Sequence, residues 1–97
     1  MPKYQKYYQD MIDQNLKMFS SFQTLHDNYE KNPTLWQIQF NKEGGKVLEI
    51  IREWERRLCQ HSERGQYGKY SQLLAEKFWN TIRLDFPRID FIGVSQT

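Results

Sequence analysis

Few residues of this chain have side chains suited to catalysis. Nucleophilic catalysis by a thiol needs a base beside it, and the single cysteine, Cys59, has His61 two places along. Residues two apart on a helix point about 200° away from each other, so these two side chains cannot share a site on one helix. We expect Cys59 to be a small, semi-buried apolar residue and His61 to be a buried histidine at one end of the core.

The two histidines are too far apart to share a metal ion. In a helical hairpin, His26 and His61 would lie at opposite ends, on the order of 35–40 Å apart at 1.5 Å rise per residue. His26, Asp27 and Glu30 form a local polar cluster, which we expect to be a solvated helix end. The sequence contains no P-loop, no dinucleotide-type glycine pattern and no metal-type cysteine pair. It therefore predicts no catalytic residue, no metal site and no cofactor.

Acidic and basic residues alternate between positions 49 and 64. The carboxylates are Glu49, Glu53, Glu55 and Glu63, and the cations are Arg52, Arg56, Arg57 and Arg64. Pairs at i,i+3 and i,i+4 stabilise a solvent-facing helix by a few tenths of a kcal/mol each. A carboxylate pair tuned for acid–base catalysis would need isolation from such cations, so we interpret this face as solvated.

The first element expected to position side chains is a helix over residues 3–30. Its apolar residues recur every three or four positions, and Asn15 occupies the one polar position of the row. This row contains Tyr4, Tyr8, Met11, Met18, Phe22, Leu25 and Tyr29, and a second row beside it contains Ile12, Leu16 and Phe19. Two adjacent rows predict a helix that packs against more than one neighbour, with possible loosening at Ser20-Ser21.

A second helix is expected over residues 34–64, after the break at Asn32-Pro33. One apolar row runs through Gly44 without a change of phase: Trp36, Phe40, Gly44, Val47, Ile51, Trp54, Leu58 and His61. Glycine costs about 1 kcal/mol in a helix interior, yet this unbroken phase predicts one helix through Gly44-Gly45. In an antiparallel hairpin Gly44 would face Phe19, which makes Gly44 a packing notch. A hinge or a ligand notch is the alternative.

A third helix, over residues 71–84, is expected to fold back on the second. Pro87 ends it, and Ile89 and Phe91 then alternate with charged residues, so the tail over residues 86–97 is predicted to be extended. We expect this tail to lie in an apolar groove between helices. Pairing with a second copy of the chain, or with a partner's sheet edge, is the alternative.

Composition limits the class of protein. The chain has 97 residues, enough for a single domain (1–97), and only 38% of them are hydrophobic while 15% are aromatic. Its 14 basic and 12 acidic residues are too balanced for a protein devoted to binding phosphates. No apolar run approaches the roughly 20 residues that cross a bilayer, and the first ten residues do not resemble a signal peptide. The prediction is an all-α, cytoplasmic three-helix bundle with no membrane contact.

The predicted function is a non-enzymatic protein-interaction or regulatory module. Three helices cannot hide all of its apolar surface, so we expect self-association, with a dimer as the commonest form. A further protein partner of unknown identity is the other occupant we consider for this surface. The predicted interaction surface contains Trp79, Phe86, Ile89, Phe91 and Ile92. The alternative is a small nucleic-acid-binding protein, because cations and rings gather at one end of the bundle: Lys3, Tyr4, Lys6, Tyr7, Arg64, Lys69 and Tyr70.

Overall fold

A computed structural model describes residues 2–63 and 68–93, and the side chains of 61–63 and 68–71 are not described. Its elements are α1 (Lys3–Gln14), α2 (Leu16–Lys31), α3 (Pro33–Glu63), α4 (Gly68–Asp85) and the short 3-10 helix η1 (Ile89–Phe91). The all-α prediction is confirmed, since the described part contains no strand. None of the described helices is long and apolar enough to span a membrane.

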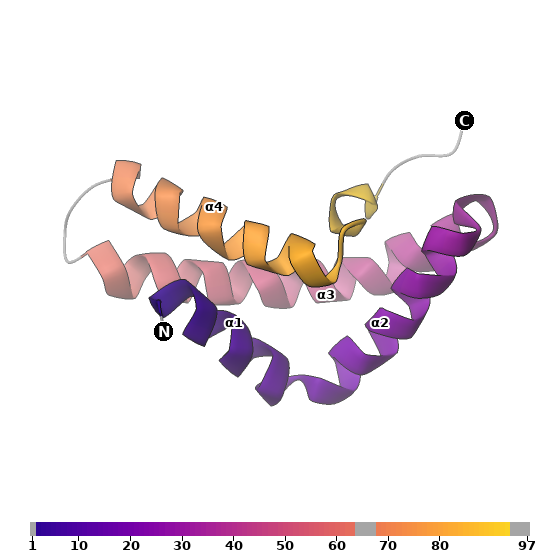
Figure 1. Ribbon diagram of the computed structural model, residues 1–97, viewed down its shortest axis with the longest axis horizontal. Helices are drawn as coiled ribbons and strands as arrows, with labels where there is room; N and C mark the ends of the chain where they lie inside the picture. Colours follow the sequence, from indigo (N-terminus) through magenta and orange to yellow (C-terminus); the bar gives the residue numbers. More distant parts are fainter. Residues whose placement is uncertain (1, 64–67, 94–97) are drawn as a thin grey trace.

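Helix α3 runs along the length of the molecule, and the other helices pack beside it (Figure 1). Its 31 residues correspond to about 46 Å of helix at 1.5 Å per residue, close to the longest dimension of the molecule, 45 Å. The prediction that this helix continues through Gly44-Gly45 is confirmed. Helix α2 packs antiparallel on the N-terminal half of α3, and α4 folds back along its C-terminal half. The predicted third helix is found as α4, which begins at Gly68 instead of Ser71.

The single helix predicted over residues 3–30 is wrong, because the chain bends at Asn15 between α1 and α2. Asn15 leaves the helical conformation at φ −129° and ψ 36°, and its Nδ2 donates to the backbone oxygen of Met11 at 3.0 Å. A short amide side chain that bonds to nearby backbone competes with the helical pattern. The bend falls at the one polar position of the apolar row and not at Ser20-Ser21. As a result the molecule has four α-helices over its described residues, and α1 and α2 form a V below α3 (Figure 1).

The predicted register of Gly44 against Phe19 is also wrong. Phe19 packs against Phe86, with ring centroids 6.2 Å apart. The space beside Gly44 is filled instead by Ile92 of the C-terminal tail. We call this space the Gly44 notch, and the side chain that fills it comes from 48 residues further along the chain.

Helix α1 is tied to the end of α4 by one buried tyrosine. The Tyr8 hydroxyl donates a hydrogen bond to Oδ2 of Asp85 at 2.5 Å. Burial of the phenol, and then the adjacent carboxylate, raise the pKa of Tyr8 above its usual value. Tyr7, one position earlier, packs its ring edge-on against Trp54 of α3 at 6.1 Å. These contacts place α1 across the pair formed by α3 and α4.

The tail after α4 is not extended, contrary to the prediction. Residues Ile89–Phe91 form the 3-10 helix η1, and Ile92, which follows it, has extended dihedral angles. Phe86 and Ile89 are buried in the same core as the helices. Of the two predicted alternatives, the tail up to Gly93 therefore takes the first and docks between helices of its own chain. Residues 94–97 lie outside the described part of the chain.

Candidate docking surfaces

The docked tail lies against four residues of α2 and α3, which we call the tail cradle: His26, Gln37, Asn41 and Gly44. Three of them bind the backbone of the tail. Nε2 of His26 accepts from the backbone N–H of Arg88 at 3.0 Å. Nε2 of Gln37 donates to the carbonyl oxygen of Phe91 at 3.2 Å, and Oδ1 of Asn41 accepts from the N–H of Gly93 at 2.7 Å.

Gln37 is the centre of this polar network. It is buried, and its Oε1 accepts from the hydroxyl of Tyr29 at 2.7 Å. Its Nε2 donates to Oδ1 of Asn41 at 2.7 Å as well as to the tail. Every polar atom of the Gln37 side chain therefore has a partner, and Tyr29 fixes which end of the amide faces the tail. A buried polar network satisfied in this way holds its members in one arrangement.

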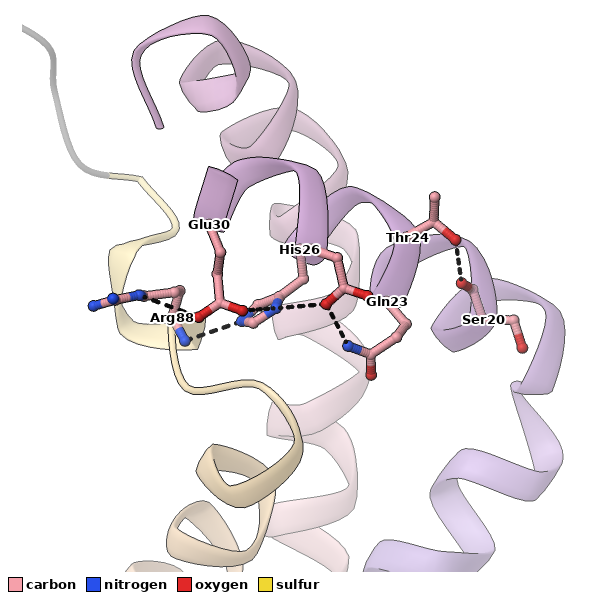
Figure 2. A network of polar contacts seen from close by, with 7 residues as sticks. Ser20, Gln23, Thr24, His26, Glu30 and Arg88 are labelled. Carbon is pink, nitrogen blue, oxygen red and sulfur yellow. Dashed lines mark hydrogen bonds and ion pairs between the residues drawn. The ribbon is translucent and has the colours of Figure 1, made fainter. Parts of the chain in front are cut away.

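His26 does not lie at a solvated helix end, as the sequence suggested, but is only 1% exposed. Its ring packs among the aromatic rings of Phe22, Phe40 and Phe86. The centroid of the His26 ring lies 5.7 to 6.2 Å from the centroids of these three rings. Its Nδ1 points toward the carboxylates of Asp27, at 3.7 Å, and Glu30, at 3.8 Å (Figure 2). The prediction failed because it treated α2 as ending in solvent, whereas the tail covers this end.

His26, Asp27 and Glu30 offer ligand atoms within 4.8 Å of one another, but their protonation does not suit a metal ion. Because Nε2 accepts the N–H of Arg88, the proton of the neutral imidazole lies on Nδ1. A metal ion on Nδ1 would require that proton on Nε2, directed at the N–H of Arg88. The geometry suits a histidine that holds the tail, with its Nδ1–H facing two carboxylates.

The notch at Gly44 determines which tail residue can dock there. A Cβ at position 44 would lie 2.6 to 2.9 Å from three carbon atoms of Ile92, well inside the usual carbon–carbon contact of about 3.5–4.0 Å. After Ile92, the backbone turns at Gly93 with φ +90°, a conformation that residues with side chains rarely adopt. The cradle thus accepts an aliphatic side chain followed by glycine.

Two ion pairs flank the docked tail. Arg83 of α4 binds both oxygens of Asp90, through Nε at 2.8 Å and Nη2 at 3.2 Å. This hydrogen bonding raises the pKa of Arg83 above its usual value. On the other side, Nε of Arg88 lies 3.5 Å from Glu30 (Figure 2). Each charged residue of the tail segment therefore meets an opposite charge on the helices.

A second surface is the outer groove, between α2 and α3 on the flank of α3 away from the tail. It encloses about 650 Å³, and its apolar walls include Leu16, Met18, Phe22, Leu25 and Val47. Leu16 and Met18 are 59% and 38% exposed, although the sequence pattern placed both in the buried rows. Lys17, Glu43 and Lys46 lie at its polar edge. On α3, Leu35 precedes Gln39 of the groove by one turn and is also exposed.

The five residues of the predicted interaction surface do not lie together on the outside. Phe86 and Ile89 belong to the core, and Ile92 is half-buried at the Gly44 notch. Phe91 is exposed on η1. Trp79 is half-buried on α4, and its Nε1 donates to Oε2 of Glu55 at 2.9 Å.

The predicted nucleic-acid end is only partly described, because Arg64 and the side chains of Lys69 and Tyr70 lie outside the described residues. Tyr4 lies beneath the ammonium of Lys77, 5.9 Å from the ring centre, and Tyr7 packs on Trp54. Lys6 pairs with Asp10 at 3.6 Å. Lys3 also makes a contact within the chain. Tyr4 and Tyr7, two of the rings that were expected to stack on bases, thus have partners within the protein.

The side chains of His61 and Glu63 lie outside the described part of the chain, so the expectations for these two residues are not tested. Cys59 is half-buried, and Glu53 pairs with Arg57 and Arg56 at 3.2 and 3.9 Å on an exposed face. Sequence reasoning missed Gln37 and Asn41. They differ by four positions and stand beside the apolar row of α3, and that spacing on one helix face was the available signal.

Comparison with protein-family models, with curated proteins and with solved structures gives no match to this chain.

Proposed function

We propose that this chain is a non-enzymatic protein-interaction module, and that its outer groove binds the same face of a second copy of the chain. The observation that carries the proposal is the exposure of Leu16 and Met18 on the wall of an apolar groove of about 650 Å³. Leu35 extends the same flank of α3 by one turn. A contiguous apolar surface of this kind is typical of a docking site.

The charges at the edge of the groove support a second copy as the occupant. Lys17 and Lys46 bring positive charge to the edge, and Glu43, which pairs with Lys46 of the same helix at 3.2 Å, brings negative charge. A two-fold contact places a surface against itself, so a self-complementary surface must carry both signs. An edge of one sign would repel its own copy.

The size of the groove supports a weak dimer. Its walls contain 12 residues, whereas a stable interface of standard size uses about 20–30 residues from each partner. We therefore expect a dissociation constant in the micromolar range or weaker, so that the monomer and the dimer exchange.

The test is the mass of the chain by light scattering over a range of concentrations. We expect a concentration-dependent dimer that is lost in Leu16→Glu and in Met18→Glu, since either change puts a charge inside the groove. Leu84→Glu is the matched control, because Leu84 is an equally apolar, exposed residue that lies on α4 and outside the groove. A monomer at every concentration would refute the proposal, as would a dimer that both groove variants leave intact.

A further inference from the structure

The tail cradle binds the tail as a receptor binds a peptide. Three of its side chains contact backbone atoms of the tail, namely the N–H of Arg88, the carbonyl of Phe91 and the N–H of Gly93. The helices, by contrast, pack on one another mainly through apolar side chains. Bonds to backbone atoms do not depend on which side chains the bound segment carries, so other segments can make them.

The side-chain contacts of the tail define a short recognition pattern. Ile89 is buried in the core, and Ile92 fills the notch beside Gly44. Asp90 pairs with Arg83, and Gly93 supplies the left-handed turn. The pattern therefore begins with an aliphatic residue that is followed directly by an acidic residue. A second aliphatic residue stands three positions after the first one, and glycine follows it directly.

The side chains of the cradle are bonded to one another as well as to the tail. Tyr29 orients the amide of Gln37, and Gln37 in turn bonds to Asn41, so the groups that hold Phe91 and Gly93 are positioned by α2 and α3 themselves. Binding groups that are held in place in advance lose little conformational entropy when a ligand docks. The charges are complementary as well, with Glu30 and Arg83 on the helices facing Arg88 and Asp90 on the tail.

We propose that the tail cradle is a peptide-binding cleft, occupied in this structure by the chain's own residues 87–93, and that it accepts from a partner protein a segment with the same pattern. The tail leaves α4 at Phe86-Pro87, and the proposal requires residues 87–93, with the core residue Ile89, to dissociate while Phe86 stays in the core. This inference is independent of the outer groove, which lies on the other flank of α3 and shares no residue with the cradle.

Competition with the tail sets the expected affinities. A tail that is joined to its own binding site acts at an effective concentration in the millimolar range, so the intact chain should bind an added peptide weakly. The probe is a fluorescently labelled synthetic peptide with the sequence of residues 87–93, Pro-Arg-Ile-Asp-Phe-Ile-Gly. The receptor is the full chain carrying Ile92→Asp, which removes the side chain from the notch and adds a charge that the notch cannot accept.

We expect the peptide to bind Ile92→Asp at least tenfold more tightly than it binds the wild-type chain, as measured by fluorescence anisotropy. Adding Gly44→Ala to Ile92→Asp should abolish binding, because the new methyl group fills the space that the isoleucine of the peptide needs. Adding Gly45→Ala instead is the matched control and should leave binding unchanged, since nothing lies within 4 Å of a Cβ at position 45. A peptide with serine in place of both isoleucines should not bind.

Circular dichroism and thermal unfolding establish that each receptor variant is folded. Where Ile92→Asp is not folded, Asp90→Arg replaces it, because this change loosens the tail by turning the ion pair with Arg83 into a repulsion at an exposed site. Absence of binding to a folded receptor would overturn the proposal, and so would binding that Gly44→Ala does not affect. Micromolar binding of the wild-type chain to the Ile92→Asp variant would also overturn the proposal. That result would show that the segment in the cradle comes from another copy of this chain and not from a different protein.

Discussion

Replacing Gly44 by alanine tests whether the tail is held by the notch, and Gly45 provides a control one residue away. Both glycines lie inside α3, where a change to alanine stabilises a helix by about 1 kcal/mol through propensity alone. A Cβ at position 45 has nothing within 4 Å. Gly45→Ala is therefore expected to raise the free energy of unfolding by about 1 kcal/mol, or roughly 4–8 °C in melting temperature for a domain of this size.

At Gly44 the same gain is opposed by loss of the docked tail. The new methyl group would lie 2.6 to 2.9 Å from three atoms of Ile92, so the whole side chain must leave the notch. Ile92 is half-buried, and losing that burial costs about 1 kcal/mol. The hydrogen bonds from the cradle to Phe91 and Gly93 each contribute roughly 0.5–1.5 kcal/mol. Gly44→Ala is then expected to be less stable than Gly45→Ala by about 2–4 kcal/mol.

The measurement is the free energy of unfolding from urea denaturation of the two variants, together with a double-mutant cycle. In an Ile92→Ala background the atoms that clash with a Cβ at position 44 are gone. There, Gly44→Ala should become stabilising, and the coupling energy between the two positions should exceed about 1 kcal/mol. Equal stability of Gly44→Ala and Gly45→Ala in the wild-type background would refute the notch, and zero coupling with Ile92 would refute the contact.

Three further predictions concern single side chains of the core. Folding raises the pKa of Tyr8 above its unfolded value of 10.0, so the contribution of Tyr8 to the free energy of unfolding should be constant below about pH 10 and fall by up to about 1.4 kcal/mol per pH unit above it. Tyr8→Phe should lose this slope in alkaline urea titrations, and an unchanged slope would assign it to another group. His26→Ala should cost about 2–4 kcal/mol in chemical denaturation, because it leaves a cavity among aromatic rings, and amide exchange at Arg88 should accelerate; a protected Arg88 amide would contradict the hydrogen bond. Trp79→Phe should lower thermal stability by about 1 kcal/mol through loss of the bond to Glu55, whereas Glu55→Gln, which retains an acceptor, should change it less.

Much of the helical architecture could be predicted because it depends on local periodicity. The row from Trp36 to Leu58 keeps one phase through Gly44-Gly45, and a helix that buries such a row tolerates the low propensity of two glycines. The all-α class and the break at Pro33 follow from the same local rules. The single polar position at Asn15 was visible in the same rows, but its effect was not, since an asparagine can also point to solvent without bending a helix.

Alternation of apolar and charged residues misled the prediction for the tail. Ile89 and Phe91 alternate with Arg88 and Asp90 as they would in a strand, yet the segment has no strand to pair with among the described residues. A 3-10 turn instead buries Ile89 and leaves Asp90 facing Arg83. Tertiary contacts override local propensity in so short a segment, because few of its bonds are internal.

The sequence alone determined the helical class, the long central helix and the presence of a small residue at position 44, because each follows from spacing along one helix. Only the tertiary structure decided what those features do. Phe19 packs against Phe86, and the tail places Ile92 beside Gly44. The same docking buried His26, which is followed in sequence by the charged residue Asp27. Contacts between residues more than 40 positions apart depend on the angles between helices, and a single bend changes those angles for every residue beyond it.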